Sequence, residues 1–303
     1  MASVATAVDH ESAARRTARG LVGSGPSIVR VLAYNRAGLV ASYALAAIVL
    51  ISFVAPLVVP EPAPDMTQVY ESPSLAHPLG TDFQGADVFA QVLRGGETVL
   101  IVGAAAAALV TLIAITFGSL AAYAGGWVDS VIGAIADVVL TIPSFPLLAV
   151  LASLIRLNNP LLLAALIGAV SWPVLLRAVR GQVLSLRERE YVEAARALEL
   201  GTPYILFREI LPNMRGYIAI YFVLSMTQAI YQQVGLYLLG FAALAGDNWG
   251  IMLNLAWYRG AIFYKGSFWY IMGPILAISL VQLAMVTMMR SLDEAFNPRL
   301  RRG

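Results

Sequence analysis

Long apolar runs alternate with short polar segments along most of this chain. Each run is about 18 residues or longer, enough for a helix to cross a bilayer core of about 30 Å. The predicted spans are residues 37–59, 98–123, 131–154, 161–179, 217–244 and 268–289. The pattern therefore predicts an all-α integral membrane protein with six transmembrane helices.

Four polar segments separate or flank these runs. Residues 1–36 lack the short apolar core of a signal peptide, so they are predicted to form a cytosolic tail. The remaining residues, 37–303, are predicted to form one membrane domain. Its polar parts are an outward loop at 61–96, a cytoplasmic loop at 182–215 and a cytosolic end at 290–303.

The positions of the basic residues predict the orientation. Of the 20 lysines and arginines, sixteen lie in the 1–36 tail, the 177–215 region or the 290–303 end. Only four lie in the alternate segments: Arg94, Arg156, Arg259 and Lys265. Because basic residues are enriched on the cytoplasmic side, both termini are expected to be cytoplasmic.

Composition excludes several kinds of chemistry. The chain is 59 % hydrophobic and 13 % charged, against about 25 % charged residues in soluble domains. It has no cysteine, and its two histidines, His10 and His77, are far apart, so no metal site is predicted. Its only lysine, Lys265, is outside any phosphate-binding loop, and no nucleophile–base pair stands out. We therefore predict a non-catalytic chain without a bound cofactor.

The cytoplasmic loop has its own pattern between residues 186 and 212. A charged stretch predicts a water-exposed helix, with opposite charges three and four apart at Arg189, Glu193, Arg196 and Glu199. Gly201 is predicted to end this helix with a positive φ angle, and Thr202 and Pro203 to begin a second helix that Pro212 ends. The second helix has an apolar face that either the spans or a separate protein must cover.

Glu193-Ala194-Ala195, Gly201 and the Ile210-Leu211-Pro212 ending resemble the EAA loop of bacterial ABC importer permeases. That motif reads E-A-A-x(3)-G with a downstream L-P, and this chain has extra residues before Gly201. The stretch HPLGTDFQGADV, which begins at His77, and the ending SLDEAFNPRL resemble the dipeptide/oligopeptide permease family, more its second permease than its first.

The resemblance implies the type I ABC importer permease architecture and the partners of such a system. These are a second permease forming a heterodimer, two ATPase subunits that hold ATP and Mg, an extracytoplasmic substrate-binding protein, and membrane lipid, with no nucleic acid. It assigns contact with the ATPases to Glu193, Ala194, Ala195, Gly201, Thr202, Pro203, Leu206, Phe207, Ile210, Leu211 and Pro212. Gly201→Asp and Glu193→Ala are accordingly expected to weaken ATPase attachment or coupling.

The resemblance also implies import of dipeptides or oligopeptides. Relatives carry oligosaccharides or nickel, and departures at Ala86 and Gln233 leave oligosaccharides open. A stand-alone secondary transporter would have repeated halves and more ionisable groups within the spans. An intramembrane enzyme would need catalytic pairs that are not evident. Copurification of an ATPase would distinguish the importer from both.

Four polar residues within the spans are candidates for the translocation path: Asp137, Gln228, Gln232 and Gln233. Polar groups at membrane depth need partners or water, so they favour inward-facing positions. Gln228 and Gln232 share a helix face at a spacing of four. The alternative for the glutamines is hydrogen bonding between helices, and the alternative for Asp137 is a position at the membrane interface.

Overall fold

The structure is a computed structural model that describes residues 36–296, with gaps at 156, 158 and 243–245. Every regular element in these ranges is helical, apart from one antiparallel bridge between Thr81 and Asp87. The predicted all-α class is therefore confirmed. Most of the predicted tail at 1–36 and the last part of the end at 290–303 lie outside the described residues.

Four described helices are long and apolar enough to cross a membrane: α3 (Arg36–Val58), α4 (Val88–Ala124), α7 (Pro160–Leu186) and α13 (Phe268–Phe296). A fifth span is formed if α5 (Gly126–Thr141) and α6 (Ser144–Leu154) cross together. The helix at the remaining predicted span, α11 (Arg215–Leu238), is not among them, since its glutamines lower its mean hydropathy. The count of six spans therefore stays a prediction.

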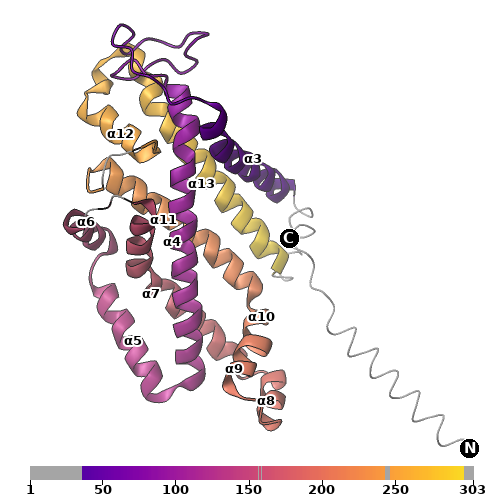
Figure 1. Cartoon of the computed structure of the whole chain (residues 1–303). Helices are drawn as coiled ribbons and strands as arrows, with labels where there is room; N and C mark the ends of the chain where they lie inside the picture. Colours follow the sequence, from indigo (N-terminus) through magenta and orange to yellow (C-terminus); the bar gives the residue numbers. More distant parts are fainter. Residues whose placement is uncertain (1–35, 156, 158, 243–245, 297–303) are drawn as a thin grey trace, which may run out of the picture.

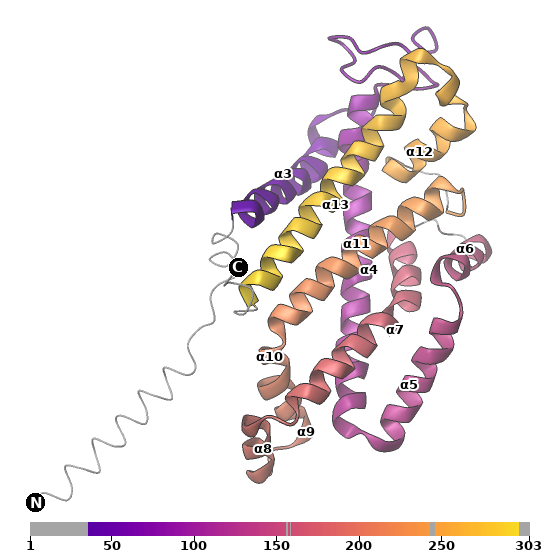
Figure 2. The same ribbon diagram turned by 180° about the vertical axis from the view of Figure 1, so that it is seen from behind.

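Helix α4 is the axis of the bundle (Figures 1 and 2). It packs most extensively along α7 and α11 on one side and contacts α3 and α13 on the other. The loop before α4 and the short helix α12 (Trp249–Tyr258) lie at one end of the bundle. Helices α8 and α9 lie at the opposite end, as the predicted orientation requires.

Helix α4 begins ten residues before the predicted second span and runs without a break from Val88 through the Gly95–Gly96 pair. These glycines do not end the helix; they admit the Trp249 ring, and a Cβ added at Gly95 would lie 2.9 Å from its Cδ1 atom. The Trp249 Nε1–H also donates to the Val92 carbonyl at 2.8 Å. Tertiary packing thus retains a helix that glycine propensity alone would weaken.

The third predicted span is broken rather than straight. Helices α5 and α6 meet at an angle of 82°. Pro143 lies at the break and forces the preceding residue, Ile142, into an extended conformation with φ −96° and ψ 126°. The breakers noted in the sequence therefore turn the chain sharply at this point.

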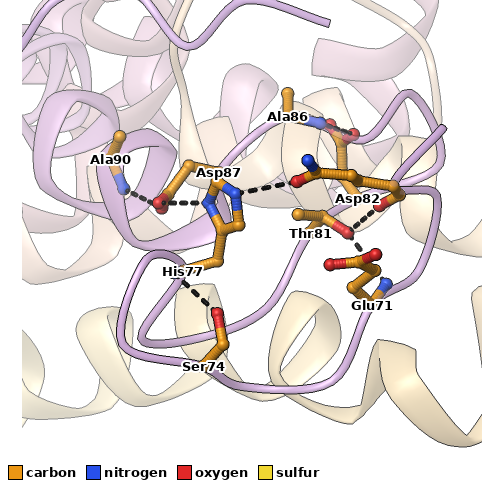
Figure 3. Close-up of polar contacts among 9 residues, drawn as sticks. Glu71, Ser74, His77, Thr81, Asp82, Ala86, Asp87 and Ala90 are labelled. Carbon is orange, nitrogen blue, oxygen red and sulfur yellow. Dashed lines mark hydrogen bonds and ion pairs between the residues drawn. The ribbon is translucent and has the colours of Figure 1, made fainter. Parts of the chain in front are cut away.

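The loop predicted to face outward, at 61–96, folds compactly before α4 through a set of hydrogen bonds (Figure 3). The His77 ring contacts Asp87 (Nδ1–Oδ2, 2.9 Å), and the other Asp87 carboxylate oxygen accepts from the Ala90 amide at 2.9 Å, which caps α4. The buried Asp82 carboxylate accepts from the Ala86 amide at 2.9 Å. The motif that begins at His77 therefore packs a cap over the bundle.

Single cysteines test the predicted orientation in this cysteine-free chain. Ser74 is exposed in the outward loop, and Ser185 is exposed in the last turn of α7 at the opposite end. We expect an impermeant thiol reagent applied to intact cells to label Ser74→Cys and to leave Ser185→Cys unlabelled. Labelling of Ser185→Cys alone would reverse the assignment.

Candidate functional site

The loop that joins α7 to α11 folds into a compact elbow at one end of the bundle (Figure 1). It comprises α8 (Glu190–Ala197), α9 (Thr202–Tyr204), the π-helical turn η1 (Ile205–Ile210) and α10 (Leu211–Asn213). We call these four elements the elbow. The predicted sequence of helix, turn and helix is present.

The inner face of the elbow is covered by the chain's own spans. Ile205, Leu206 and Ile210 are buried, together with Val192 and Ala195 of α8. They join one hydrophobic cluster with residues of the spans, among them Val110, Ala114, Leu175, Leu176, Val179 and Val183. The sequence allowed either the spans or a separate protein to cover this apolar face, and the structure shows that the spans bury most of it. Leu206 and Ile210 are therefore not free to contact a partner.

The outer face of the elbow remains open. Leu198 and Phe207 are 72 % and 68 % exposed, and Tyr204 is 42 % exposed. Thr202 and Pro203 are also exposed, and the Arg208 guanidinium lies 5.7 Å from the centre of the Tyr204 ring. We call Leu198, Glu199, Thr202, Pro203, Tyr204 and Phe207 the outer elbow surface. Rigid anchoring beneath an exposed aromatic surface is what a docking site for another protein requires.

The prediction of a positive φ angle at Gly201 is wrong. Gly201 has φ −61° and ψ 153°, and a Cβ there would meet only the Pro203 Cδ atom at 3.8 Å. The left-handed residue is Glu199, with φ 54°. The Glu199 amide donates to the Arg196 carbonyl and the Leu200 amide to the Ala195 carbonyl, which form a Schellman motif at the end of α8. The expected disturbance of the turn by Gly201→Asp therefore loses its structural basis.

This geometry predicts that Glu199→Gly stabilises the elbow. Glycine adopts the left-handed conformation without the steric strain of a side chain, so we expect a gain of about 1 kcal/mol. Thermal unfolding of the purified chain in detergent would measure it. Ala197→Gly is the matched control and is expected to lower the unfolding temperature, because Ala197 lies within α8, where glycine costs more conformational entropy. An equal response of the two positions would contradict the assignment.

The charged contacts predicted along α8 do not form. The Arg196 guanidinium lies 5.4 Å from the centre of the Tyr123 ring, and Arg187 donates to the Ala122 carbonyl at 2.7 Å. Both arginines thus hold the elbow to the end of α4. The exposed Glu193 carboxylate makes no hydrogen bond or ion pair with any described residue, which leaves it open to a partner.

Two predicted boundaries of the second helix also differ. Gly201, rather than Thr202, precedes the first helical residue, and the Thr202 side chain makes no capping bond. Pro212 does not end the helix, because it lies within the first turn of α10, where a missing amide hydrogen is tolerated.

The remaining residues of the elbow differ in exposure. On α8, partial burial raises the pKa of the Tyr191 hydroxyl. Ala194 is exposed and Leu211 is half-buried.

A second candidate site is a cavity of about 470 Å³ between α5, α7 and α11. Gln228 and Gln232 both line it, as their shared helix face predicted. Ser171 of α7 donates to the Gln232 Oε1 atom at 3.1 Å. The cavity lining also includes Leu140, Pro143, Ser144, Tyr221, Ser225 and several aliphatic side chains. We call this space the glutamine cavity.

Gln233 is not part of this cavity. Its side chain is fully buried and its Nε2 donates to the Val99 carbonyl of α4 at 2.6 Å. Adjacent helical residues point about 100° apart, so Gln232 and Gln233 face different surroundings. For Gln233, the structure therefore supports the alternative role of a hydrogen bond between helices rather than a position on the translocation path.

Asp137 also lies outside the glutamine cavity, in a separate hollow where it pairs with Arg177. Sequence reasoning missed the arginine partner because the two residues are 40 positions apart. It also missed Ser171, whose only sequence signal is a hydroxyl within an apolar run.

Comparison with known proteins shows which family this chain belongs to. Residues 114–302 match the family described as binding-protein-dependent transport system inner membrane component. The chain belongs to this family. The match spans the elbow and both glutamines of the cavity. Membership favours a transport-system subunit over the stand-alone transporter and the intramembrane enzyme.

Individual relatives are similar over most of their length. A putative peptide permease protein of Brucella suis biovar 1 is 35 % identical over 78 % of this chain and 77 % of its own length. The oligopeptide transport system permease protein OppC of Mycobacterium tuberculosis H37Rv is 32 % identical over 73 % and 77 %. The dipeptide transport system permease protein DppC of Alkalihalophilus pseudofirmus is 30 % identical over 88 % and 87 %. The predicted resemblance to the second permease of the dipeptide/oligopeptide group is confirmed.

Proposed function

We propose that this chain is the permease subunit of an ATP-driven ABC importer of peptides. It pairs with a second permease to enclose a translocation path and binds two ATPase subunits together with that permease. An extracytoplasmic substrate-binding protein delivers the peptide. ATP and Mg bind to the ATPases, and this chain holds no cofactor.

The contrast between the buried inner face and the exposed outer face of the elbow supports this proposal. Its inner residues, Ile205 and Ile210, are buried among the spans, while Phe207 between them in the sequence is 68 % exposed. A push on Phe207 is therefore transmitted to α7 and α11, the helices that line the glutamine cavity. Docking of a short helix into a groove of the ATPase fits this arrangement.

Movement of the ATPases would open the path alternately to the two sides. When the ATPases close on ATP, the elbows of the two permeases approach and the attached helices tilt as rigid bodies. Gln228 and Gln232 would then supply polar contacts to a passing peptide. Glu193, whose carboxylate has no partner among the described residues, supplies a charged contact to the ATPase.

Copurification tests the assignment directly. We expect an affinity-tagged copy of this chain, extracted from its own cells in mild detergent, to retain a second permease and an ATPase. We also expect ATP hydrolysis by that complex to rise when the peptide-loaded binding protein is added. Isolation of the chain without an ATPase, under conditions that keep the two permeases together, would contradict the proposal.

The glutamine cavity predicts a transport defect without an assembly defect. Leucine at both Gln228 and Gln232 removes two polar groups from the path, and we expect peptide uptake to fall about tenfold. Uptake of a labelled peptide by proteoliposomes measures it, with complex yield as the check on assembly.

Tyr231 on the same helix provides the matched control, because it is exposed and does not line the cavity. Tyr231→Leu should leave uptake near the level of the unaltered complex. Normal uptake by the double leucine variant would remove both glutamines from the path.

A further inference from the structure

Helices α5 and α7 carry two ion pairs on the elbow side of the glutamine cavity. Arg180 of α7 holds Asp129 of α5 through two hydrogen bonds, each of 2.5 Å. Arg177 of α7 donates to Asp137 of α5. Both acidic residues therefore belong to one helix and both basic residues to the other.

These four side chains line an open hollow of about 620 Å³. The other lining residues are small or aliphatic: Ser130, Gly133, Ala134 and Leu176. We call this space the charged hollow. Its α5 wall carries the acidic residues and its α7 wall the basic residues, and the two sets are joined as ion pairs.

The exposure of one pair indicates what fills the hollow. The Arg177 and Asp137 side chains are 56 % and 63 % exposed although they lie in helices of the membrane domain. Charges this open would be strongly penalised against hydrocarbon, so this face adjoins water or protein.

The charged hollow also continues the glutamine cavity along the same two helices. Val174 and Leu175 line the cavity, and the next residues, Leu176 and Arg177, line the hollow. On α5, Asp137 lies in the hollow two residues before Val139 in the cavity. A solute that leaves the cavity toward the elbow end therefore meets the two charged walls next.

Two walls of opposite sign are complementary to a solute that carries both charges. A carboxylate can accept two parallel hydrogen bonds from an arginine, and an ammonium group can pair with an aspartate. A neutral oligosaccharide would leave these charges unused. Nickel favours imidazole or thiolate ligands, which the lining residues lack, and the arginine wall would repel it.

We propose that the charged hollow is a transit site for peptides with free termini, with the carboxylate on the α7 wall and the ammonium group on the α5 wall. The inference rests on the proposed import of peptides and names the charge pattern that this chain accepts. Each peptide terminus takes the place of one partner in an arginine–aspartate pair. Because an existing ion pair is broken for each new contact, binding stays weak enough for the peptide to leave. Once the peptide has passed, the pairs close again and hold α5 to α7.

A thiol at the rim of the hollow tests this site. Ser130 is exposed there, and Ser130→Cys gives the chain a single cysteine within the purified importer complex. The probes are trialanine with free termini and N-acetyl-trialanine amide, each added at millimolar concentration without the binding protein. We expect trialanine to slow maleimide labelling about threefold at twice its dissociation constant, and the blocked peptide to have no effect.

Neutralising one pair should abolish this protection. Arg177→Gln with Asp137→Asn removes a charge from each wall and retains hydrogen-bonding groups. The control is Glu71→Gln with Lys265→Gln, which removes one charge of each sign at exposed positions outside the hollow and should leave protection intact. Equal protection by both peptides, protection by neither, or protection that survives neutralisation would overturn the site. Retention of the ATPase by the same complexes would show that the proposed function itself still stands.

Discussion

Phe207→Glu is expected to release the ATPase subunits from this chain while leaving the chain folded. Phe207 is 68 % exposed and sits between buried residues of the elbow, so it is the largest apolar group offered to a partner there. Exposed aromatics that fill a partner's pocket typically contribute 2 kcal/mol or more, which corresponds to an affinity loss of about 30-fold. A carboxylate at this position would also have to be desolvated on docking.

Retention of the ATPase by the tagged chain across a series of detergent washes measures this effect. Phe263→Glu is the matched control, because Phe263 is 88 % exposed but lies in the segment after α12, at the other end of the bundle. It should retain the ATPase at the normal level. An unchanged unfolding temperature for both variants would separate lost docking from lost folding. Normal attachment of Phe207→Glu would place the ATPase contact elsewhere.

Arg94→Ala should cause the largest loss of stability at the end of the bundle that carries the loop before α4. The Arg94 guanidinium joins three segments: Nε donates to Asp247 at 2.6 Å, and Nη1 donates to the carbonyls of Val59 at 2.8 Å and Pro56 at 3.3 Å. The Arg94 and Asp247 side chains are only 17 % and 26 % exposed. Alanine would leave a carboxylate and two carbonyl groups with fewer partners, at a cost of about 3 kcal/mol.

Thermal unfolding of the purified chain in detergent would report that loss. Arg215→Ala is the control, because Arg215 is exposed at the start of α11 and should change the unfolding free energy by less than about 0.5 kcal/mol. Asp247→Asn retains an acceptor for Arg94 and should fall between the two. Equal unfolding temperatures for Arg94→Ala and Arg215→Ala would show that the three segments are held by other contacts.

The elbow shows which features of a loop the local sequence pattern can predict and which it cannot. The alternation of apolar and charged positions predicted its place, its helices and the need to cover its apolar face. It did not predict which residue takes the left-handed conformation. That depends on where α8 ends, and the packing of Val192 and Ala195 against the spans sets this end, so Glu199 rather than Gly201 is left-handed.

In the membrane domain, too, some features follow from the sequence alone and others from tertiary packing. Apolar runs of about 20 residues determine by themselves that the chain is helical and membrane-embedded, because a helix of that length crosses the bilayer and satisfies its own backbone hydrogen bonds. The spacing of Gln228 and Gln232 likewise determines that they share a face. Only the tertiary structure decided that Gln233, one residue further, turns into the contact with α4.

The charged hollow marks the limit of the sequence most clearly. Four ionisable residues are visible in the printed chain, but Asp129 and Arg180 are separated by 51 positions, and local periodicity relates only residues within a few turns. The turn between α4 and α5 places Asp129 at the start of α5, and the contact of α5 with α7 brings it to Arg180. The sequence thus determined which elements form and which faces are polar, while the packing of distant helices decided which polar groups meet, because that depends on the whole bundle.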